Sequence, residues 1–382
     1  MSSELPPELW LRVFEEVPGT YLPRIHAVSR AFRDISRRII FEEIEFKIFD
    51  PPANDGHRRR RYGSPAFGPA DVQRELKRIA FWSSPEIAPY VRRCNVVVKD
   101  NVAIVSASPS TLVSACLEAL PKFTNLQMLR FSAGVLELPV LGVGTLPKRL
   151  SIRRAQLALP SNLTARQLPV RHFSYTEMPV RRSEDAPSYL SFLDPATLES
   201  LQLRTDSVVR SAVNSVHLPR DRMSMASFRN LHVLELIFED GSFTEIHACL
   251  SPFPDIQDLT LELRGVCTPD ALPVTALAPH LHRYTGPCIL VPLILSHTAP
   301  QDIRISGGFA QDLLQALQGS GGARGSITSL LVSIKYRDLS SPLLSDVLAF
   351  FPNLVTLTVH IYLGKQPAVE DLTTVLHAPE VR

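Results

Sequence analysis

One short apolar pattern recurs along most of this 382-residue chain and constrains its fold more than any other feature. It places apolar residues at positions 1, 4 and 6 of a short run, as in "LVTLTV" at 354–359. Successive runs start 19 to 33 residues apart, and their mean spacing of about 25 suits repeats that pair one strand with one return segment. Ten such runs are present, and two of them have proline in the first position. They begin at Leu126, Pro147, Val170, Leu198, Leu231, Ile256, Leu281, Pro300, Ile327 and Leu354. Val91 begins an earlier, irregular run.

The spacing predicts an α/β fold in which the runs are strands of a parallel sheet. A single strand with its return segment cannot bury its own apolar side, so such units must stack on one another. Positions 4 and 6 then point inward, and positions 3, 5 and 7 point outward because strand side chains alternate. Leucine-rich repeats usually carry Asn or Cys three residues after position 6, and this chain does not. The expectation is therefore an irregular leucine-rich-repeat solenoid.

An ordinary α/β domain with parallel strands would show similar spacing and is the alternative fold. A recurring lead-in just before the first apolar position favours the repeat interpretation. It reads F-[PTR]-[ND]-[LI] and starts at Phe123, Phe228, Phe253 and Phe351.

Composition and motifs exclude several functional classes. The net charge of +2 and the 20% of charged residues give no general attraction to nucleic acid or membrane. No apolar stretch is long enough to span a bilayer, and no signal peptide is expected. The five scattered cysteines contain no C-x-x-C, which is typical of reduced thiols in a cytoplasmic or nuclear protein. No motif for catalysis, metal or cofactor binding is present, so the chain is not expected to be an enzyme.

The first residues differ from the repeats. The segment 5–36, "LPPELWLRVFEEVPGTYLPRIHAVSRAFRDIS", predicts a helix that starts at Pro6-Pro7 and ends at Pro18-Gly19. A short segment 21–29 and a helix over 30–43 follow. Three short helices bury little surface on their own. Their apolar residues exceed what such a small core needs, which indicates a surface for a partner.

This segment resembles an F-box, whose pattern is LP-x-E-[IL], an apolar pair, and then a V-[CS]-[KR]-x-[WF]-x-x-[LI] helix. Phe32 stands where Trp is common, and Ser29 where Cys is common. The resemblance implies a substrate receptor of an SCF-type cullin–RING ubiquitin ligase, which docks on a Skp-type adaptor subunit. Internal packing of a helical cap is the other interpretation of these residues. By position, the adaptor-binding residues would be Leu5, Pro6, Glu8, Leu9, Val13, Phe14, Leu22, Ile25, Val28, Ser29 and Phe32.

The resulting domain boundaries are residues 1–46 for the F-box, 47–75 for a linker, and 76–382 for the repeats. The linker contains the arginine run 58–61, which suits a solvated loop, a nuclear-import signal or a nucleic-acid patch. At the other end, Val381 would open another strand. We therefore expect the chain to be truncated there, or covered by a partner, with a self-associating edge at the strand that follows Leu354.

Charged residues at outward strand positions suggest where a target protein would bind. Arg130, Arg149, Arg153 and Arg204 fall at such positions in the first repeats, and they could converge on an acidic or phosphorylated segment. Glu235, Asp258 and Glu262 would repel the wrong end of it. The main hypothesis is thus a ubiquitin-ligase substrate adaptor acting with a cullin. A stand-alone repeat scaffold is the second hypothesis, and an enzyme is the third.

Overall fold

A computed structural model shows how these patterns fold, and the chain divides into two compact units. The first contains residues 1–170 and 174–178, and the second contains residues 171–173 and 179–382. Each unit is described by itself. The structure describes residues 5–49, 69–99, 111–137, 147–158, 168–176, 193–204, 228–238, 241–251, 253–270, 278–306, 310–319, 324–335, 346, 349–362 and 373–377.

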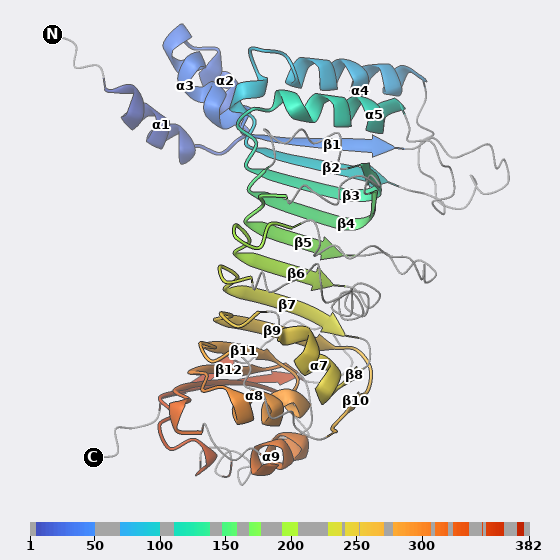
Figure 1. Cartoon of the computed structure of the whole chain (residues 1–382). Coiled ribbons are helices and arrows are strands. Elements are labelled where there is room, and N and C mark those ends of the chain that lie inside the picture. The colour runs from blue at the N-terminus through green and yellow to red at the C-terminus, as the bar shows by residue number, and fades with distance from the viewer. Residues whose placement is uncertain are drawn as a thin grey trace. The chain divides into compact units, whose positions relative to one another are not determined.

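The first unit begins with three short helices and continues into a parallel sheet (Figure 1). The helices are α1 (Pro7–Glu15), α2 (Leu22–His26) and α3 (Arg30–Ile40). The sheet has the strand order β1 (Glu43–Phe49), β2 (Arg93–Lys99), β3 (Met128–Glu137) and β4 (Arg149–Ala158). Return segments contribute α4 (Pro69–Trp82), α5 (Thr111–Ala119) and the 3-10 helices η1 (Ala88–Tyr90) and η2 (Leu120–Lys122).

The second unit repeats the same arrangement with more strands. Its parallel strands, in spatial order, are β6 (Ser200–Arg204), β7 (Val233–Phe238), β9 (Asp258–Leu263), β11 (Arg283–Gly286), β12 (Asp302–Ile305), β13 (Ser329–Lys335) and β14 (Thr356–Tyr362). The antiparallel β15 (Thr373–His377) pairs with β14. The units divide within β5 (His172–Thr176). Further elements are β8 (Gly241–Ser242), β10 (Cys267–Thr268), α7 (Phe243–Leu250), α8 (Val291–His297), α9 (Ala310–Gly319), η6 (Cys288–Leu290) and η7 (Arg324–Ser326).

Strand positions agree with the repeat pattern residue by residue. Ten strands, β3 to β7, β9 and β11 to β14, each begin two residues after a predicted start, and β2 begins two residues after Val91. The apolar residues at positions 4 and 6 form the core. In β3, for example, Leu129 and Phe131 are fully buried, while Arg130 between them is exposed. The predicted α/β class, the parallel sheet and the N-terminal helical domain are confirmed.

Similar hydrogen bonds link three of the strand lead-ins to the preceding repeat. The side-chain amides of Asn125 and Asn353, one residue before position 1, donate to the carbonyls of Pro89 and Gly325 at 2.7 Å. Asn230 donates to Ala196 in the same way. These three asparagines therefore connect neighbouring strand lead-ins within each compact unit, at a position different from the one where sequence analysis looked for them. These bonds satisfy carbonyl groups in the turns.

The strand at the start of the sheet was not foreseen. We expected a helix over 30–43 and a linker over 47–75, but α3 ends at Ile40 and β1 pairs with β2, with Glu43 opposite Arg93. The run "FEEIEF" at 41–46 has the same 1, 4, 6 pattern, and Ile44 and Phe46 are buried. The expected linker overlaps β1 and α4, and its arginine run 58–61 lies outside the described residues.

The far edge of the second unit also differs from expectation. β14 was predicted to present an unpaired edge, with a further strand at Val381. Instead β15 covers that edge in antiparallel orientation, with Thr356 opposite His377. The residues around Val381 lie outside the described residues. An exposed β14 edge is therefore wrong for this structure.

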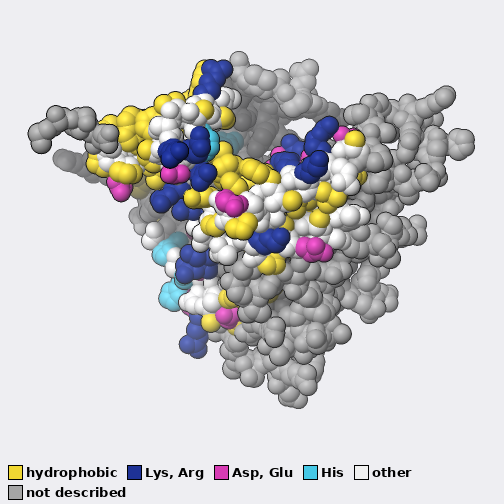
Figure 2. All heavy atoms as spheres, turned by 90° about the horizontal axis from the view of Figure 1, so that it is seen from above, with side chains coloured by type: hydrophobic (Ala, Val, Ile, Leu, Met, Phe, Trp, Pro, Cys, Tyr) yellow, Lys and Arg dark blue, Asp and Glu magenta, His cyan; other side chains and the backbone are white. Residues whose placement is uncertain are grey.

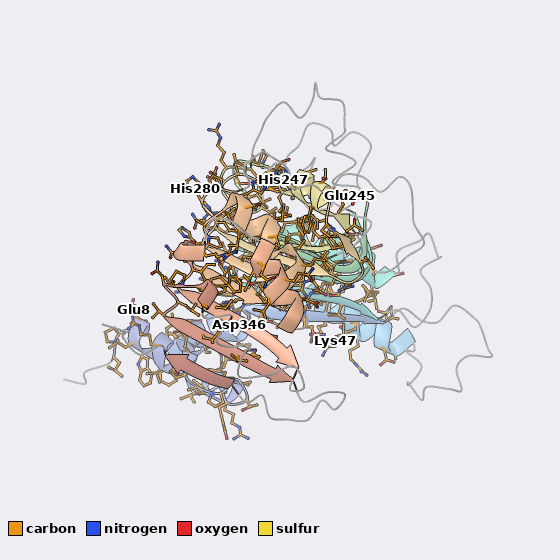
Figure 3. All side chains as sticks on the ribbon, turned by 90° about the horizontal axis from the view of Figure 1, so that it is seen from below. Glu8, Lys47, Glu245, His247, His280 and Asp346 are labelled. Atoms are coloured by element: carbon orange, nitrogen blue, oxygen red, sulfur yellow. The ribbon has the colours of Figure 1, made fainter. Side chains whose placement is uncertain are left out.

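Local packing explains α7 and one atypical strand. At the start of α7, the Ser242 hydroxyl accepts from the N–H of Glu245 at 3.3 Å, and the Glu245 carboxylate accepts from the N–H of Ser242 at 3.0 Å. This capping box fixes the first turn of the helix that carries Glu245 and His247 (Figure 3).

In β11, Tyr284 at position 4 is fully buried and donates to the carbonyl of Pro287 at 3.1 Å. Its ring takes the space that position 6 fills elsewhere, which leaves room only for Gly286.

We expect Gly286→Ala to lower the free energy of unfolding by about 2 kcal/mol, because overpacking forces neighbours to shift. A Cβ at this position would lie 2.8 Å from the Leu261 carbonyl oxygen and would press on the Tyr284 hydroxyl. In a Tyr284→Leu background the same change should cost less, because only the contact with the Leu261 carbonyl oxygen remains. Urea unfolding of the parent, the two single variants and the double variant measures the coupling between residues 284 and 286. An equal cost in both backgrounds would contradict the proposed packing.

Candidate functional site

Helix α1 packs one of its sides into the N-terminal helical domain. The ring centroid of Phe32 on α3 lies 4.8 Å from that of Trp10 and 5.2 Å from that of Phe14. Phe14 is only 2% exposed. Ser29 caps α3 by accepting from the N–H of Phe32 at 3.1 Å, which fixes the first turn of the helix that carries this ring. These three aromatic rings form the core between α1 and α3.

A second side of α1 is apolar and exposed. Leu9 and Val13, four residues apart, share one face of α1, and Leu5 precedes the helix; each of the three is 46% exposed. We call these three residues the apolar stripe. Val28 and Tyr21 elsewhere in the helical domain are 69% and 52% exposed. Figure 2 shows hydrophobic side chains gathered on the face that carries the helical end of the chain.

The predicted docking residues therefore fall into two groups. Pro6 and Glu8 are exposed beside the apolar stripe, and Ser29 is exposed while it caps α3. In contrast, Phe14 and Leu22 are buried, and Ile25 and Phe32 are partly buried. The expectation that Phe14 would be left uncovered by a small core is corrected: it is part of that core.

Sequence analysis missed the residues that join the helical domain to the sheet. The Phe41 ring contacts His26 of α2 at 6.5 Å and Phe81 and Trp82 of α4 at 6.1 and 5.3 Å between centroids. The carbonyl of Glu42 accepts from the N–H groups that lead into β2, each at 2.9 Å. Phe41 is the first apolar position of the overlooked run at 41–46, and that pattern could have identified it.

Burial and nearby cations also affect His26 in this helical domain. Its Nδ1 lies 3.0 Å from the hydroxyl of Ser36, which is fully buried. Burial, followed by the positive charges of Arg33 and Arg37, lowers the pKa of His26 below its ordinary value. The neutral ring is therefore favoured at neutral pH, and it stays in the core with Ser36 and Phe41.

Three of the four arginines proposed for target binding share one surface. Arg130 on β3 and Arg149 and Arg153 on β4 are exposed at outward positions of adjacent strands. We call them the arginine triad. Arg204 belongs to the second unit, and its guanidinium contacts the Glu235 carboxylate at 2.6 Å. Three of the four predicted arginines therefore lie on one surface of the first unit, and the fourth has an acidic partner.

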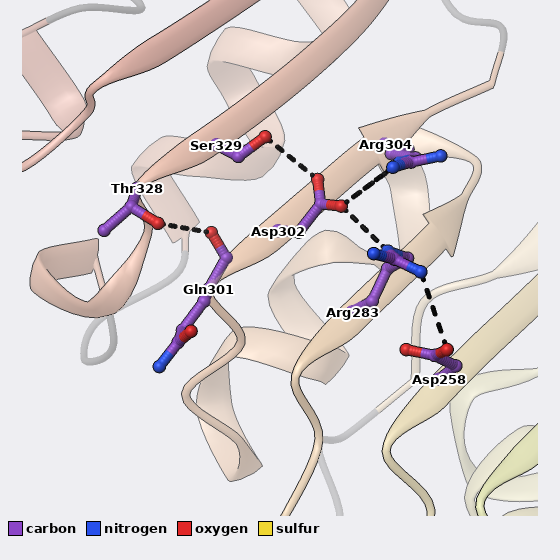
Figure 4. A network of polar contacts seen from close by, with 7 residues as sticks. All are labelled: Asp258, Arg283, Gln301, Asp302, Arg304, Thr328 and Ser329. Carbon is purple, nitrogen blue, oxygen red and sulfur yellow. Dashed lines mark hydrogen bonds and ion pairs between the residues drawn. The ribbon is translucent and has the colours of Figure 1, made fainter.

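The acidic residues expected to repel a target are instead paired. Glu262 contacts Arg264 at 3.2 Å, and Asp258 contacts Arg283 at 3.5 Å. Figure 4 shows Arg283 reaching from Asp258 to Asp302, which also binds Arg304 and accepts from the Ser329 hydroxyl. The Arg283–Asp302 and Arg304–Asp302 distances are 2.8 and 3.1 Å. This outward surface of β9 to β13 is therefore internally neutralised.

The network also determines the ionisation of Asp302. Burial alone would raise its pKa, but hydrogen bonds from Arg283 and Arg304, the charge of Arg304 and the Ser329 hydroxyl outweigh burial and lower the pKa below its ordinary value. A carboxyl group with a lowered pKa in the folded state stabilises the protein above its unfolded pKa, and that contribution is lost as pH falls through the folded pKa.

Comparison with known families identifies one domain. The F-box domain matches residues 2–43, the segment that forms α1, α2 and α3 and carries the apolar stripe. No curated protein sequence matched the chain. In the part of the chain that the structure describes, no helix is both long and apolar enough to cross a bilayer. No three His, Cys, Asp or Glu side chains among those residues are grouped as metal ligands.

We expect Asp302→Asn to lower the free energy of unfolding by about 1–2 kcal/mol at pH 7, because two guanidinium groups lose their shared carboxylate. The difference from the parent should shrink as pH falls below about 4, where this carboxyl group is protonated in the unfolded chain, and should be lost as pH falls through the lowered pKa of the folded state. Urea unfolding at pH 7 and pH 3 measures it. The matched control is Asp346→Asn at an exposed position (Figure 3). A pH-independent difference would show that the ion pairs do not stabilise the fold.

Proposed function

We propose that this chain is a substrate-recognition adaptor of an SCF-type cullin–RING ubiquitin ligase and is not itself an enzyme. F-box domains generally bind Skp-type adaptors in such complexes, and residues 2–43 match that domain. In this proposal the F-box docks the adaptor subunit, a cullin completes the ligase, and the sheet units hold a protein target. Transfer of ubiquitin then depends on proximity rather than on a reaction catalysed by this chain.

The observation that carries the proposal is the apolar stripe. Leu5, Leu9 and Val13 remain about half exposed although a neighbouring side of α1, which carries Trp10 and Phe14, packs into an aromatic core. A helix that only capped a repeat array would have no need of this second apolar side. Apolar side chains at a protein interface that become fully desolvated can each contribute 2 kcal/mol or more.

The connection between the F-box and the sheet suits such a positioning role. α3 ends at Ile40 and β1 begins at Glu43, and the Phe41, Phe81 and Trp82 rings pack across this junction. A target held on the first unit would therefore keep a defined position relative to the docked adaptor. We further infer that both units are leucine-rich-repeat-like, on the basis of the constant strand register and the recurring asparagine bonds.

The cysteines support a location in the cytoplasm, the nucleus or both. All five are free and buried. Burial raises the pKa of Cys116 to about 12, and burial with the nearby Glu245 raises that of Cys249 to about 12. Such thiols are unreactive core residues. They fit a protein that works in a reducing compartment.

Replacing Leu9 and Val13 together with Ala should weaken binding to the Skp-type adaptor about 100-fold or more, because each change removes an interface anchor. The melting temperature should stay close to that of the parent, because both side chains are exposed. Phe14→Ala should instead destabilise the helical domain by about 3 kcal/mol through loss of its core. Co-purification of the full chain with the adaptor, together with thermal melting, separates the two effects.

The matched control removes two exposed valines elsewhere, Val266→Ala with Val355→Ala, which are 70% and 62% exposed in the second unit. It should bind the adaptor as well as the parent does. If the Leu9/Val13 variant also binds normally, the docking proposal fails. A parent chain that binds no Skp-type adaptor would favour the stand-alone repeat scaffold.

A further inference from the structure

Two histidines from different helices of the second unit lie against each other. His247 is on α7 (Figure 3), and His297 is the last residue of α8. Their ring centroids are 5.7 Å apart, and the ring planes are inclined by 64°. His247 is only 8% exposed. This ring contact joins two helices that are separated in the sequence by the strands β9, β10 and β11.

The Nε2 atom of His297 is buried and has no hydrogen-bond partner. Among the residues that the structure describes, no other buried side-chain nitrogen or oxygen is in this state. The neighbouring hydroxyl of Thr298 donates instead to the carbonyl of Ile294 at 2.8 Å. In a protonated imidazole both nitrogens carry a hydrogen, so Nε2 would become a buried donor without an acceptor. Such a donor is costly in a folded protein.

The other residues of α8 give His297 apolar neighbours. Val291, Leu293, Ile294 and Leu295 are each at most 2% exposed. A charged imidazole is poorly solvated in such surroundings, and a second imidazole at close range adds a like charge. Burial, followed by the charge of His247, accordingly lowers the pKa of His297 below its ordinary value.

The charged groups on the surrounding elements do not neutralise a proton on His297. η6 and α9 pack against α8, and β8 packs against α7. Besides the two histidines, the titratable groups of α7, η6 and α9 are Glu245, Cys249, Cys288 and Asp312, and β8 has none. Burial keeps the two thiols neutral by raising the pKa of each. Both carboxylates are exposed to solvent, and neither offsets the effect of His247 on His297.

We propose that the His247–His297 pair is an acid-sensitive contact, which holds α7 and α8 together while His297 is neutral and releases them when His297 is protonated. Acidification would then loosen these helices of the second unit without any ligand. The proposal concerns the second unit and does not depend on the proposed adaptor function.

Proton linkage gives the direction and the size of the effect. A histidine whose pKa is lowered by folding contributes stability that is complete above its unfolded pKa of about 6.5. That contribution is lost as pH falls through the folded pKa. At pH 5.5, one such histidine can change the equilibrium between the closed and the open contact by at most about 10-fold.

Amide hydrogen exchange of the full chain at pH 7.5 and pH 5.5 tests this contact, after correction for the intrinsic pH dependence of exchange. In the parent, the protection of α7 and α8 should fall at pH 5.5 by up to about 10-fold relative to that of α5. His297→Gln has no titratable group at this position and should show no such loss. His247→Gln should lose less protection than the parent, because His297 no longer faces a second imidazole. Each protein is compared with itself at pH 7.5, so a packing defect in a variant does not affect the result.

His280→Gln is the matched control, because His280 is an exposed histidine of the same unit (Figure 3). It should lose protection as the parent does. A parent whose α7 and α8 keep their full relative protection at pH 5.5 would overturn the proposal. A His297→Gln variant that loses as much protection as the parent would also overturn it.

Added Zn²⁺ at pH 7.5 separates a proton-sensitive contact from a metal site, because neutral imidazole also binds this ion. The protection of α7 and α8 should not change. Protection that rises with Zn²⁺ in the parent, and does not rise in His297→Gln, would show that the pair holds a metal ion instead.

Discussion

The whole sheet depends on one constraint: a parallel strand that is apolar on one side needs a neighbour in the same register. Most of the described lead-ins meet it in the same way. The carbonyl of Arg92 accepts from the N–H groups of Gln127 and Met128, and the carbonyl of Gln257 accepts from those of His282 and Arg283. Each bond pair aligns positions 4 and 6 of one strand with those of the next. A shift by one residue would turn the apolar side chains to solvent.

That constraint leaves the outward positions free to vary, and the two units use them differently. In the second unit, Asp302 is shared between Arg283 and Arg304, and Arg204 is neutralised by Glu235. Such exposed or half-exposed ion pairs contribute modestly to stability, but they neutralise the charge of the outward surface. In the first unit, the arginine triad keeps its charge. Opposite functional properties therefore arise from the same backbone arrangement.

The helical domain shows how one short segment serves two interfaces. α1 presents Trp10 and Phe14 to the inside of the domain and the apolar stripe to solvent. Phe41 follows the last turn of α3 and also occupies the first apolar position of the run that forms β1. Its ring contacts those of Phe81 and Trp82. The F-box therefore continues into the sheet without a separate linker, which connects the proposed docking surface mechanically to the proposed target surface.

The sequence by itself determined the positions of ten strands, their inward residues and the N-terminal helices, because strand alternation and repeat spacing are local properties of the chain. β1 was overlooked, although the run at 41–46 has the 1, 4, 6 pattern, because Glu42 and Glu43 were interpreted as the end of a helix; pairing with β2 shows that the segment is a strand. Helix periodicity also left open which side of α1 is buried; packing against Phe32 decides this. Pairing of charges and the antiparallel β15 were likewise decided by tertiary structure, because they depend on which residues meet across strands that are distant in sequence.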